Sequence, residues 1–146
     1  MYYFDASYLI PLVRLERSSE VATAYAGMLP KGSQITSLWA QVECRSGLAR
    51  EVRMGRMSKS EFDGLWRKLS ELVGSSFRVV GHSDLDYRRA SEMLGEPRLG
   101  LRAGDALHLA LAERLGADLL LTLDRKLAVV AGTLGVAAGT GFREKM

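Results

Sequence analysis

The sequence of 146 residues has very little of the sulfur and imidazole chemistry that stabilises secreted or zinc-binding proteins. Cys44 is its one cysteine, which excludes a disulfide framework and a cysteine-based zinc cluster. It has two histidines, His82 and His108, too few for a histidine-rich zinc or iron site.

Long hydrophobic runs are also missing. No stretch approaches 18 apolar residues, so we expect no segment to span a membrane. The first residues, Met1 to Asp5, do not combine a basic region with an apolar stretch, and no signal peptide is expected. These absences favour a cytoplasmic protein.

The overall composition is that of an ordinary globular chain. Hydrophobic residues make up 47% and charged residues 25%, and the length suits a single domain over residues 1–146. The formal net charge of +3 is compatible with a polyanionic partner. A solvated surface with a small excess of arginine explains the same charge equally well.

Short apolar runs without alternation indicate buried strands of a parallel sheet. Three clear ones are Met1 to Phe4, Phe77 to Val80 and Leu119 to Leu123, and two weaker ones are Gln34 to Thr36 and Gly135 to Ala138. They alternate with helical patterns that have recognisable ends, such as the capping-box spacing of Ser58 and Glu61 and the Gly116 that follows Leu115. We expect helices after Asp5 (continuing towards Met28), from Ser37 to Arg53, from Ser58 to Val73 with Gly74 as the stop, from Ser83 to Gly95, from Ala103 to Leu115, and from Arg125 to Ala131. The order predicts a three-layer α/β/α domain with a mainly parallel central sheet of about five strands.

Two aspartates follow predicted strands. Asp5 comes after the first apolar run, and Asp124 comes after Leu119 to Leu123. Each could simply cap the helix that comes next. However, the carboxyl ends of parallel strands meet at the edge of the sheet where ligands bind, which favours a shared site.

Two further acids stand inside predicted helices. Glu43 has no basic residue three or four positions away, so no local ion pair accounts for it. Asp105 begins a largely apolar helix, where an acid in the first turn either stabilises the helix dipole or points into a cleft. Both also remain compatible with ordinary helical positions.

Bringing four carboxylates together is unfavourable without a counter-charge. Two of them ~4 Å apart repel by about 4 kcal/mol at an effective dielectric near 20. Magnesium or manganese, which prefer oxygen ligands, would remove that repulsion. Such a centre can activate water for attack at phosphorus, so an all-acid site suits phosphodiester hydrolysis.

Four segments together resemble the acidic motifs of PIN domains. They are Asp5-Ala6-Ser7, Thr36-Ser37-Leu38-Trp39-Ala40-Gln41-Val42-Glu43, Leu101-Arg102-Ala103-Gly104-Asp105-Ala106-Leu107-His108-Leu109-Ala110 and Leu121-Thr122-Leu123-Asp124-Arg125-Lys126-Leu127. Each is weak alone, but the four occur in the family's order over most of the chain. The length and the lack of accessory domains are similar to the VapC toxins of toxin–antitoxin pairs.

The resemblance implies a Mg²⁺- or Mn²⁺-dependent endoribonuclease acting on RNA. Asp5, Glu43, Asp105 and Asp124 would form its catalytic, metal-binding site. Ser7 and Thr122 would orient carboxylates or bound water, unless they only serve the turns. It also implies a homodimer and a VapB-like antitoxin that covers the site.

Several other features have two interpretations. His108, one turn after Asp105, could share a metal with it, but on so apolar a helix a packed, hydrogen-bonded histidine is favoured. The basic residues from Arg45 to Lys68 could approach RNA or form a solvated helical hairpin. Leu65, Trp66 and Leu69 suit a core or an interface, and Asp86 a capping acid.

Other activities share part of the pattern. A haloacid-dehalogenase phosphatase needs a second aspartate where Ser7 stands, and a receiver domain needs an aspartate and lysine set that is missing. Two alternatives remain open: a non-catalytic PIN-like module that binds RNA or protein, and an RNA-processing PIN nuclease that is not a toxin.

Overall fold

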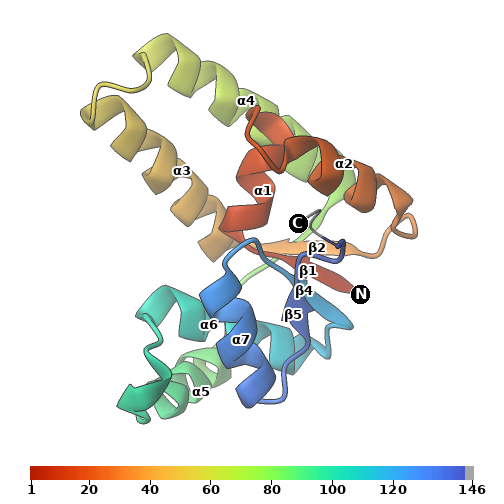
Figure 1. Cartoon of the computed structure of the whole chain (residues 1–146), viewed down its shortest axis with the longest axis vertical. Helices are drawn as coiled ribbons and strands as arrows, with labels where there is room; N and C mark the ends of the chain where they lie inside the picture. The colour runs from red at the N-terminus through yellow and green to blue at the C-terminus, as the bar shows by residue number, and fades with distance from the viewer. Residues whose placement is uncertain (144–146) are drawn as a thin grey trace.

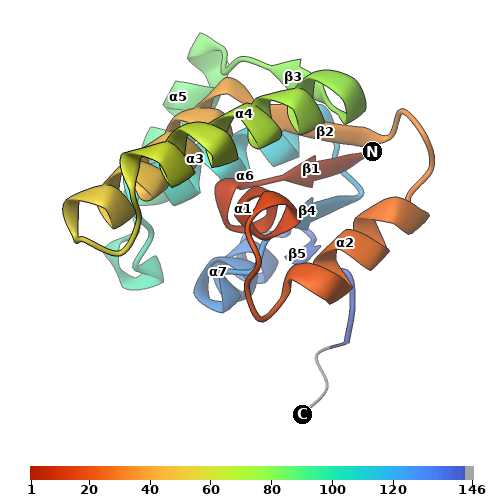
Figure 2. The ribbon, with the colours of Figure 1, turned by 90° about the horizontal axis from the view of Figure 1, so that it is seen from above.

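Short parallel strands form a sheet at the centre of the computed structural model, which describes residues 1–143. The strands are β1 (Tyr2–Phe4), β2 (Gln34–Ser37), β3 (Arg78–Val80), β4 (Leu119–Leu121) and β5 (Ala138–Gly139). Their order is β3-β2-β1-β4-β5, which can be followed by the labels in Figure 2. Tyr2 is in register with Gln34 on one side and Leu119 on the other, so β1 is the central strand.

Helices cover both faces of this sheet. They are α1 (Ala6–Val13), α2 (Ser19–Met28), α3 (Leu38–Arg53), α4 (Lys59–Ser76), α5 (Asp84–Leu94), α6 (Ala103–Leu115) and α7 (Arg125–Thr133), with a 3₁₀ turn, η1, at Pro97–Leu99. In Figure 1, α1 to α4 lie on one side of the strands and α5 to α7 on the other. The expected three-layer α/β/α architecture with a parallel sheet is confirmed.

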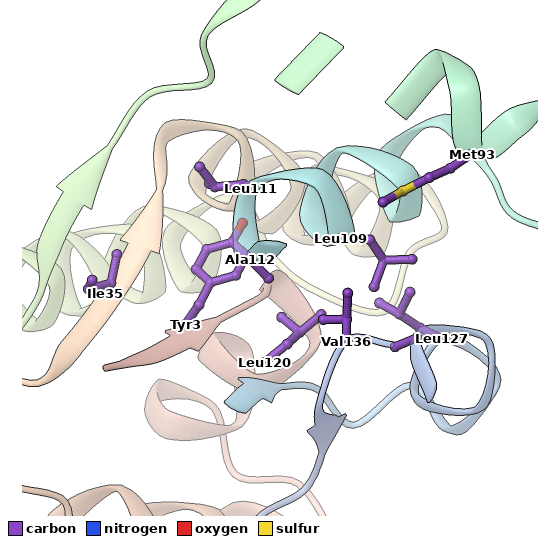
Figure 3. Packing of buried hydrophobic residues seen from close by; sticks show 10 residues of the cluster. Tyr3, Ile35, Met93, Leu109, Leu111, Ala112, Leu120, Leu127 and Val136 are labelled. Atoms are coloured by element: carbon purple, nitrogen blue, oxygen red, sulfur yellow. The ribbon is translucent and has the colours of Figure 1, made fainter. Parts of the chain in front are cut away.

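Successive side chains of the central strand point to opposite faces of the sheet, which explains why two cores form. Tyr3 packs with α6 and α7 residues in one cluster, whereas Phe4 packs with α1 and α3 residues in the other. Both side chains are 0% exposed. Figure 3 shows the first cluster, in which Leu109 and Leu120 approach each other from α6 and β4. The layers on both sides therefore fix β1, and with it the residue that follows, Asp5.

Three details of the sequence-based prediction are wrong. The run ending at Val80 is largely exposed, because β3 is an edge strand that pairs only with β2. Gly74 does not stop its helix, which continues to Ser76, because space around Gly74 is open and helical backbone suits it there. The helical stretch after Asp5 is interrupted, so α1 and α2 are separate helices.

The capping predictions were more accurate. Ser58 and Glu61 form the expected capping box at the start of α4. Gly116 ends α6 in the left-handed conformation, with φ of 59°, which glycine adopts readily. Within residues 1–143, no helix is both long and apolar enough to cross a membrane.

Candidate active site

A cleft of about 370 Å³ opens at the edge of the sheet where β1 and β4 end. Asp5 directly follows β1, and Asp124 lies just beyond β4. Glu43 reaches the cleft from α3 and Asp105 from the first turn of α6. All four acids expected from the sequence thus line one cleft, and their catalytic role stays a prediction. The lining residues are Asp5, Ala6, Ser7, Trp39, Glu43, Arg102, Gly104, Asp105, His108, Asp124 and Leu127.

Asp5 is the most buried of these acids, at 3% exposure. It caps α1: its Oδ1 accepts hydrogen bonds from the Tyr8 amide at 3.1 Å and from the Ser7 hydroxyl at 2.7 Å. Burial raises the pKa of Asp5, and the nearby His108 and the hydrogen bonds from Thr122, Ser7 and Tyr8 offset only part of that effect. Without a bound cation, the ionised form of Asp5 is less favourable than it is in water. A positive charge placed in the cleft would therefore stabilise it.

Ser7 and Thr122 connect the ends of the two strands. The Ser7 hydroxyl donates to Asp5, and its oxygen accepts the Leu123 amide at 2.9 Å. Thr122 Oγ1 lies 3.2 Å from Ser7 Oγ and accepts the Asp124 amide at 3.0 Å. These hydroxyls bind a carboxylate and also stabilise the turn, and their role in a catalytic site stays a prediction.

Asp105 and Asp124 both cap helices as well as lining the cleft. Asp124 Oδ1 accepts the Leu127 amide at 3.0 Å at the start of α7. Asp105 Oδ2 accepts the Arg102 amide at 3.2 Å and lies 3.7 Å from Arg102 Nε. The Arg102 side chain is 81% exposed, so this ion pair contributes little to stability.

Glu43 has a partner that sequence reasoning missed. His108 Nε2 lies 2.5 Å from Glu43 Oε2, although the two residues are 65 positions apart. His108 is 3% exposed and its Nδ1 bonds to the Tyr3 hydroxyl, which agrees with the packed, hydrogen-bonded histidine that the apolar helix favours. A histidine one turn from Asp105 was the available signal, but its partner is visible only in three dimensions.

Trp39 and Gly104 form the wall around Glu43. A Cβ at position 104 would lie 2.7 Å from Glu43 Oε1 and 3.3 Å from the Trp39 ring. Glycine is therefore needed for the close approach of α3 and α6. Trp39 stands one helical turn before Glu43, a spacing that could have indicated it from the sequence.

The donor set matches the chemistry of Mg²⁺ or Mn²⁺, since four carboxylates offer oxygen ligands. Within residues 1–143, no three acids, cysteines or histidines are arranged as a ready-made metal site. Mg²⁺ needs only one or two carboxylates because it keeps several waters. The buried Asp5, whose negative charge is only partly compensated, fits such an ion.

Two other groups of charges have local partners. Asp86 caps α5, as expected, and also binds Arg114. In the basic hairpin, Arg56 pairs with Glu51 and Lys59 pairs with Asp63. These pairs favour the solvated-hairpin interpretation for part of the basic set.

Residues 2–133 match the family model of the PIN domain. No curated protein sequence matches the chain. Among solved structures, FitAcB from Neisseria gonorrhoeae has a TM-score of 0.76 at 16% identity and covers 97% of this chain and 98% of its own. The sarcin–ricin loop cleaving toxin VapC20 from Mycobacterium tuberculosis has a TM-score of 0.72 at 16% identity, covering 88% and 94%. VapBC-1 from nontypeable Haemophilus influenzae has a TM-score of 0.69 at 13% identity, covering 97% and 98%.

At these identities the structural likeness establishes a shared fold, whereas the family model rests on the sequence itself and spans nearly the whole chain. The resemblance found in the four acidic motifs is thereby confirmed: the chain belongs to the PIN-domain family.

Proposed function

We propose that this PIN-domain protein is a metal-dependent endoribonuclease that hydrolyses RNA phosphodiester bonds, and that it is the toxin of a toxin–antitoxin pair. The observation that carries the proposal is the cleft at the carboxyl edge of the sheet, lined by Asp5, Glu43, Asp105 and Asp124. Asp5 is buried there, and the nearby His108 and the hydrogen bonds to Asp5 offset only part of the effect of burial. A divalent cation supplies the missing charge.

The proposed cofactor is Mg²⁺ or Mn²⁺, held by the four acids directly or through water. When bound, it lowers the pKa of a coordinated water and stabilises charge on the phosphodiester oxygens. Ser7 and Thr122 keep Asp5 in place through their hydrogen bonds. Asp105 and Asp124 are fixed by the amides of their own helices.

Arg102 is suited to hold the substrate. It lines the cleft, and its guanidinium is 81% exposed and only loosely paired with Asp105. An arginine in this position can exchange a weak ion pair for a phosphate oxygen of RNA. The cleft thus offers carboxylates that can bind a cation and an arginine that can bind the phosphate backbone of the substrate.

The proposed partners follow from the relatives. One neighbour is a VapBC complex and another is a sarcin–ricin loop cleaving toxin, which supports RNA as the substrate and a VapB-like antitoxin as the partner. We further propose a homodimer, a single domain over the whole chain and a cytoplasmic location. Size-exclusion chromatography with light scattering tests the dimer, and a short antitoxin gene directly upstream would favour the toxin over a housekeeping nuclease.

The decisive experiment uses purified protein free of antitoxin. Wild type and Asp105→Asn are incubated with total cellular RNA and Mg²⁺ or Mn²⁺, with and without EDTA, and the cut ends are mapped. We expect discrete cleavage by wild type and none with EDTA or with Asp105→Asn.

No cleavage by folded, metal-loaded wild type would support a non-catalytic RNA- or protein-binding module instead. Equal cleavage by Asp105→Asn would mean that a contaminant or a different site cuts the RNA.

A further inference from the structure

A chain of buried hydrogen bonds runs from the centre of the sheet to the acidic cleft. Ser37 Oγ lies 2.9 Å from the Tyr3 hydroxyl, which lies 2.6 Å from His108 Nδ1. His108 Nε2 then lies 2.5 Å from Glu43 Oε2. The members come from β2, β1, α6 and α3, so the chain of hydrogen bonds connects β1 and α6 to the consecutive elements β2 and α3.

The direction of this chain follows from its two ends. The Ala40 amide donates to Ser37 Oγ at 2.9 Å, and the Ser37 hydroxyl can still donate its own proton to the Tyr3 oxygen. At the other end, a carboxylate only accepts, so His108 presents an Nε2–H to Glu43. Nδ1 then accepts the Tyr3 hydroxyl proton. Every donor in the chain meets an acceptor.

The depth of this chain makes it more than a surface contact. Tyr3 and Ser37 are 0% exposed and His108 is 3% exposed. Polar groups at this depth hold one arrangement, because any other leaves a donor or an acceptor unpaired.

The geometry leaves one oxygen of Glu43 available. His108 binds Oε2, whereas Oε1 lies against the backbone of Gly104 and, within residues 1–143, accepts no hydrogen bond. The imidazole and the glycine therefore hold the carboxylate on both sides while Oε1 remains at the cleft.

We propose that His108, oriented by Tyr3 and Ser37, is a positioning residue that fixes Glu43 as a metal ligand through its Oε1. The proposal rests on the metal-dependent function proposed above. Polar groups that orient a ligand in this way contribute to metal affinity, and removing them costs about 10- to 100-fold.

The test measures Mn²⁺ affinity on the full chain, from the electron paramagnetic resonance signal of free Mn²⁺. His108→Leu removes the donor, and we expect affinity to fall by about 10- to 100-fold. His108→Gln keeps an N–H that can reach Glu43, and we expect it to restore affinity to within about fivefold of wild type. Tyr3→Phe leaves the imidazole without its orienting hydroxyl, and we expect a loss of about fivefold.

His82 provides a matched control. It is the other histidine, and its Nε2 bonds to the carbonyl of Leu107 rather than to an acid. His82→Gln should bind Mn²⁺ as wild type does. Wild-type affinity in His108→Leu, or an equal loss in His108→Gln and His108→Leu, would overturn the proposal. If His108→Leu does not melt cooperatively, Tyr3→Phe becomes the deciding variant. An Mn²⁺ affinity of Tyr3→Phe equal to that of wild type would then overturn the proposal.

RNA cleavage by the same wild-type preparation separates this inference from the proposed function. Cleavage with an unchanged affinity in His108→Leu removes the inference alone. A weakened affinity in His108→Leu without any cleavage by wild type supports the inference and removes the nuclease. A wild type that does not bind Mn²⁺ overturns both.

Discussion

Asp5 and Asp86 are almost equally inaccessible to solvent but have different surroundings. Asp5 is 3% exposed and Asp86 is 1% exposed. Asp86 accepts two hydrogen bonds from Arg114, at 2.7 and 2.8 Å, and one from the Ser83 amide at 2.7 Å. Within residues 1–143, the hydrogen bonds to Asp5 come from hydroxyl and amide groups, and His108 lies nearby, but Asp5 forms no ion pair there with an arginine or lysine.

The pKa values separate the two carboxyls in the same way. At Asp86, burial raises the pKa, but Arg114 and Ser83 outweigh burial and the result lies below the usual range. At Asp5, burial dominates and the pKa is raised. A buried acid with its own arginine is complete within the protein, whereas a buried acid without one favours an external cation.

The largest difference that we expect between Asp5 and Asp86 is in RNA cleavage. Asp5→Asn should lower the cleavage rate by at least about 100-fold, because an uncharged amide binds a divalent cation poorly. Asp86→Asn, measured well below its melting temperature, should cut within a few-fold of wild type. Comparable losses in the two variants would mean that burial, rather than the missing counter-charge, marks the functional acid.

For the free energy of unfolding, in contrast to cleavage, we expect the larger loss from the substitution of Asp86. Asp86→Asn should lower the free energy of unfolding by about 2 kcal/mol, less than a fully buried pair because Arg114 is 37% exposed. The melting temperature would then fall by about 6 °C. Asp63→Asn, in an exposed pair with Lys59, is the control and should change stability by less than about 1 kcal/mol.

The loss of stability in Asp86→Asn should depend on pH. Because the pKa of Asp86 is lowered in the folded state, its stabilisation is present above the unfolded pKa of about 3.9 and is lost as the pH falls through the folded pKa. Denaturant titrations should show wild type and Asp86→Asn converging below about pH 4. A difference that grows on acidification would contradict the lowered pKa.

A substitution of Gly104 tests whether the close packing around Glu43 matters for cleavage. Gly104→Ala should displace the Glu43 carboxylate, since its Cβ would lie 2.7 Å from Oε1, and cleavage should fall by about tenfold. Gly47→Ala is the control, because no atom lies within 4 Å of its Cβ position. If Gly104→Ala cuts RNA as fast as Gly47→Ala, the position of Glu43 does not limit the reaction.

The smallest expected effect is a gain. In metal-free buffer, Asp5→Asn should raise the free energy of unfolding by about 1 kcal/mol, because it removes a buried charge that the nearby His108 and the hydrogen bonds offset only in part. The melting temperature would rise by about 3 °C. A clear loss of stability would mean that the hydroxyl and amide donors compensate the charge fully.

The sequence predicted best what depends on local pattern. The apolar run ending at Phe4, the capping box at Ser58 and the terminal Gly116 each specify local geometry, and each appears where expected. The acids at Asp5 and Asp124 could be placed together because parallel strands share a carboxyl edge.

What the sequence could not provide were contacts between distant segments. His108 and Glu43 are 65 positions apart, and Arg114 is 28 positions from Asp86. No local period relates such pairs, since they meet only when α6 packs against α5 and the start of α6 approaches α3 at the cleft. The exposure of β3 was missed for a similar reason, because its position at the edge of the sheet depends on the strand order, and the valines beside Arg78 do not reveal that order.

The most direct test of the central claim is the melting temperature of three proteins with and without Mn²⁺. At a concentration ~100 times its dissociation constant, a bound ion adds about 2.7 kcal/mol and raises the melting temperature by roughly 8 °C. We expect this rise in wild type and in Asp86→Asn, and none in Asp5→Asn. A rise in Asp5→Asn equal to that of wild type, or no rise in wild type, would contradict the assignment of the cleft as a metal-dependent site.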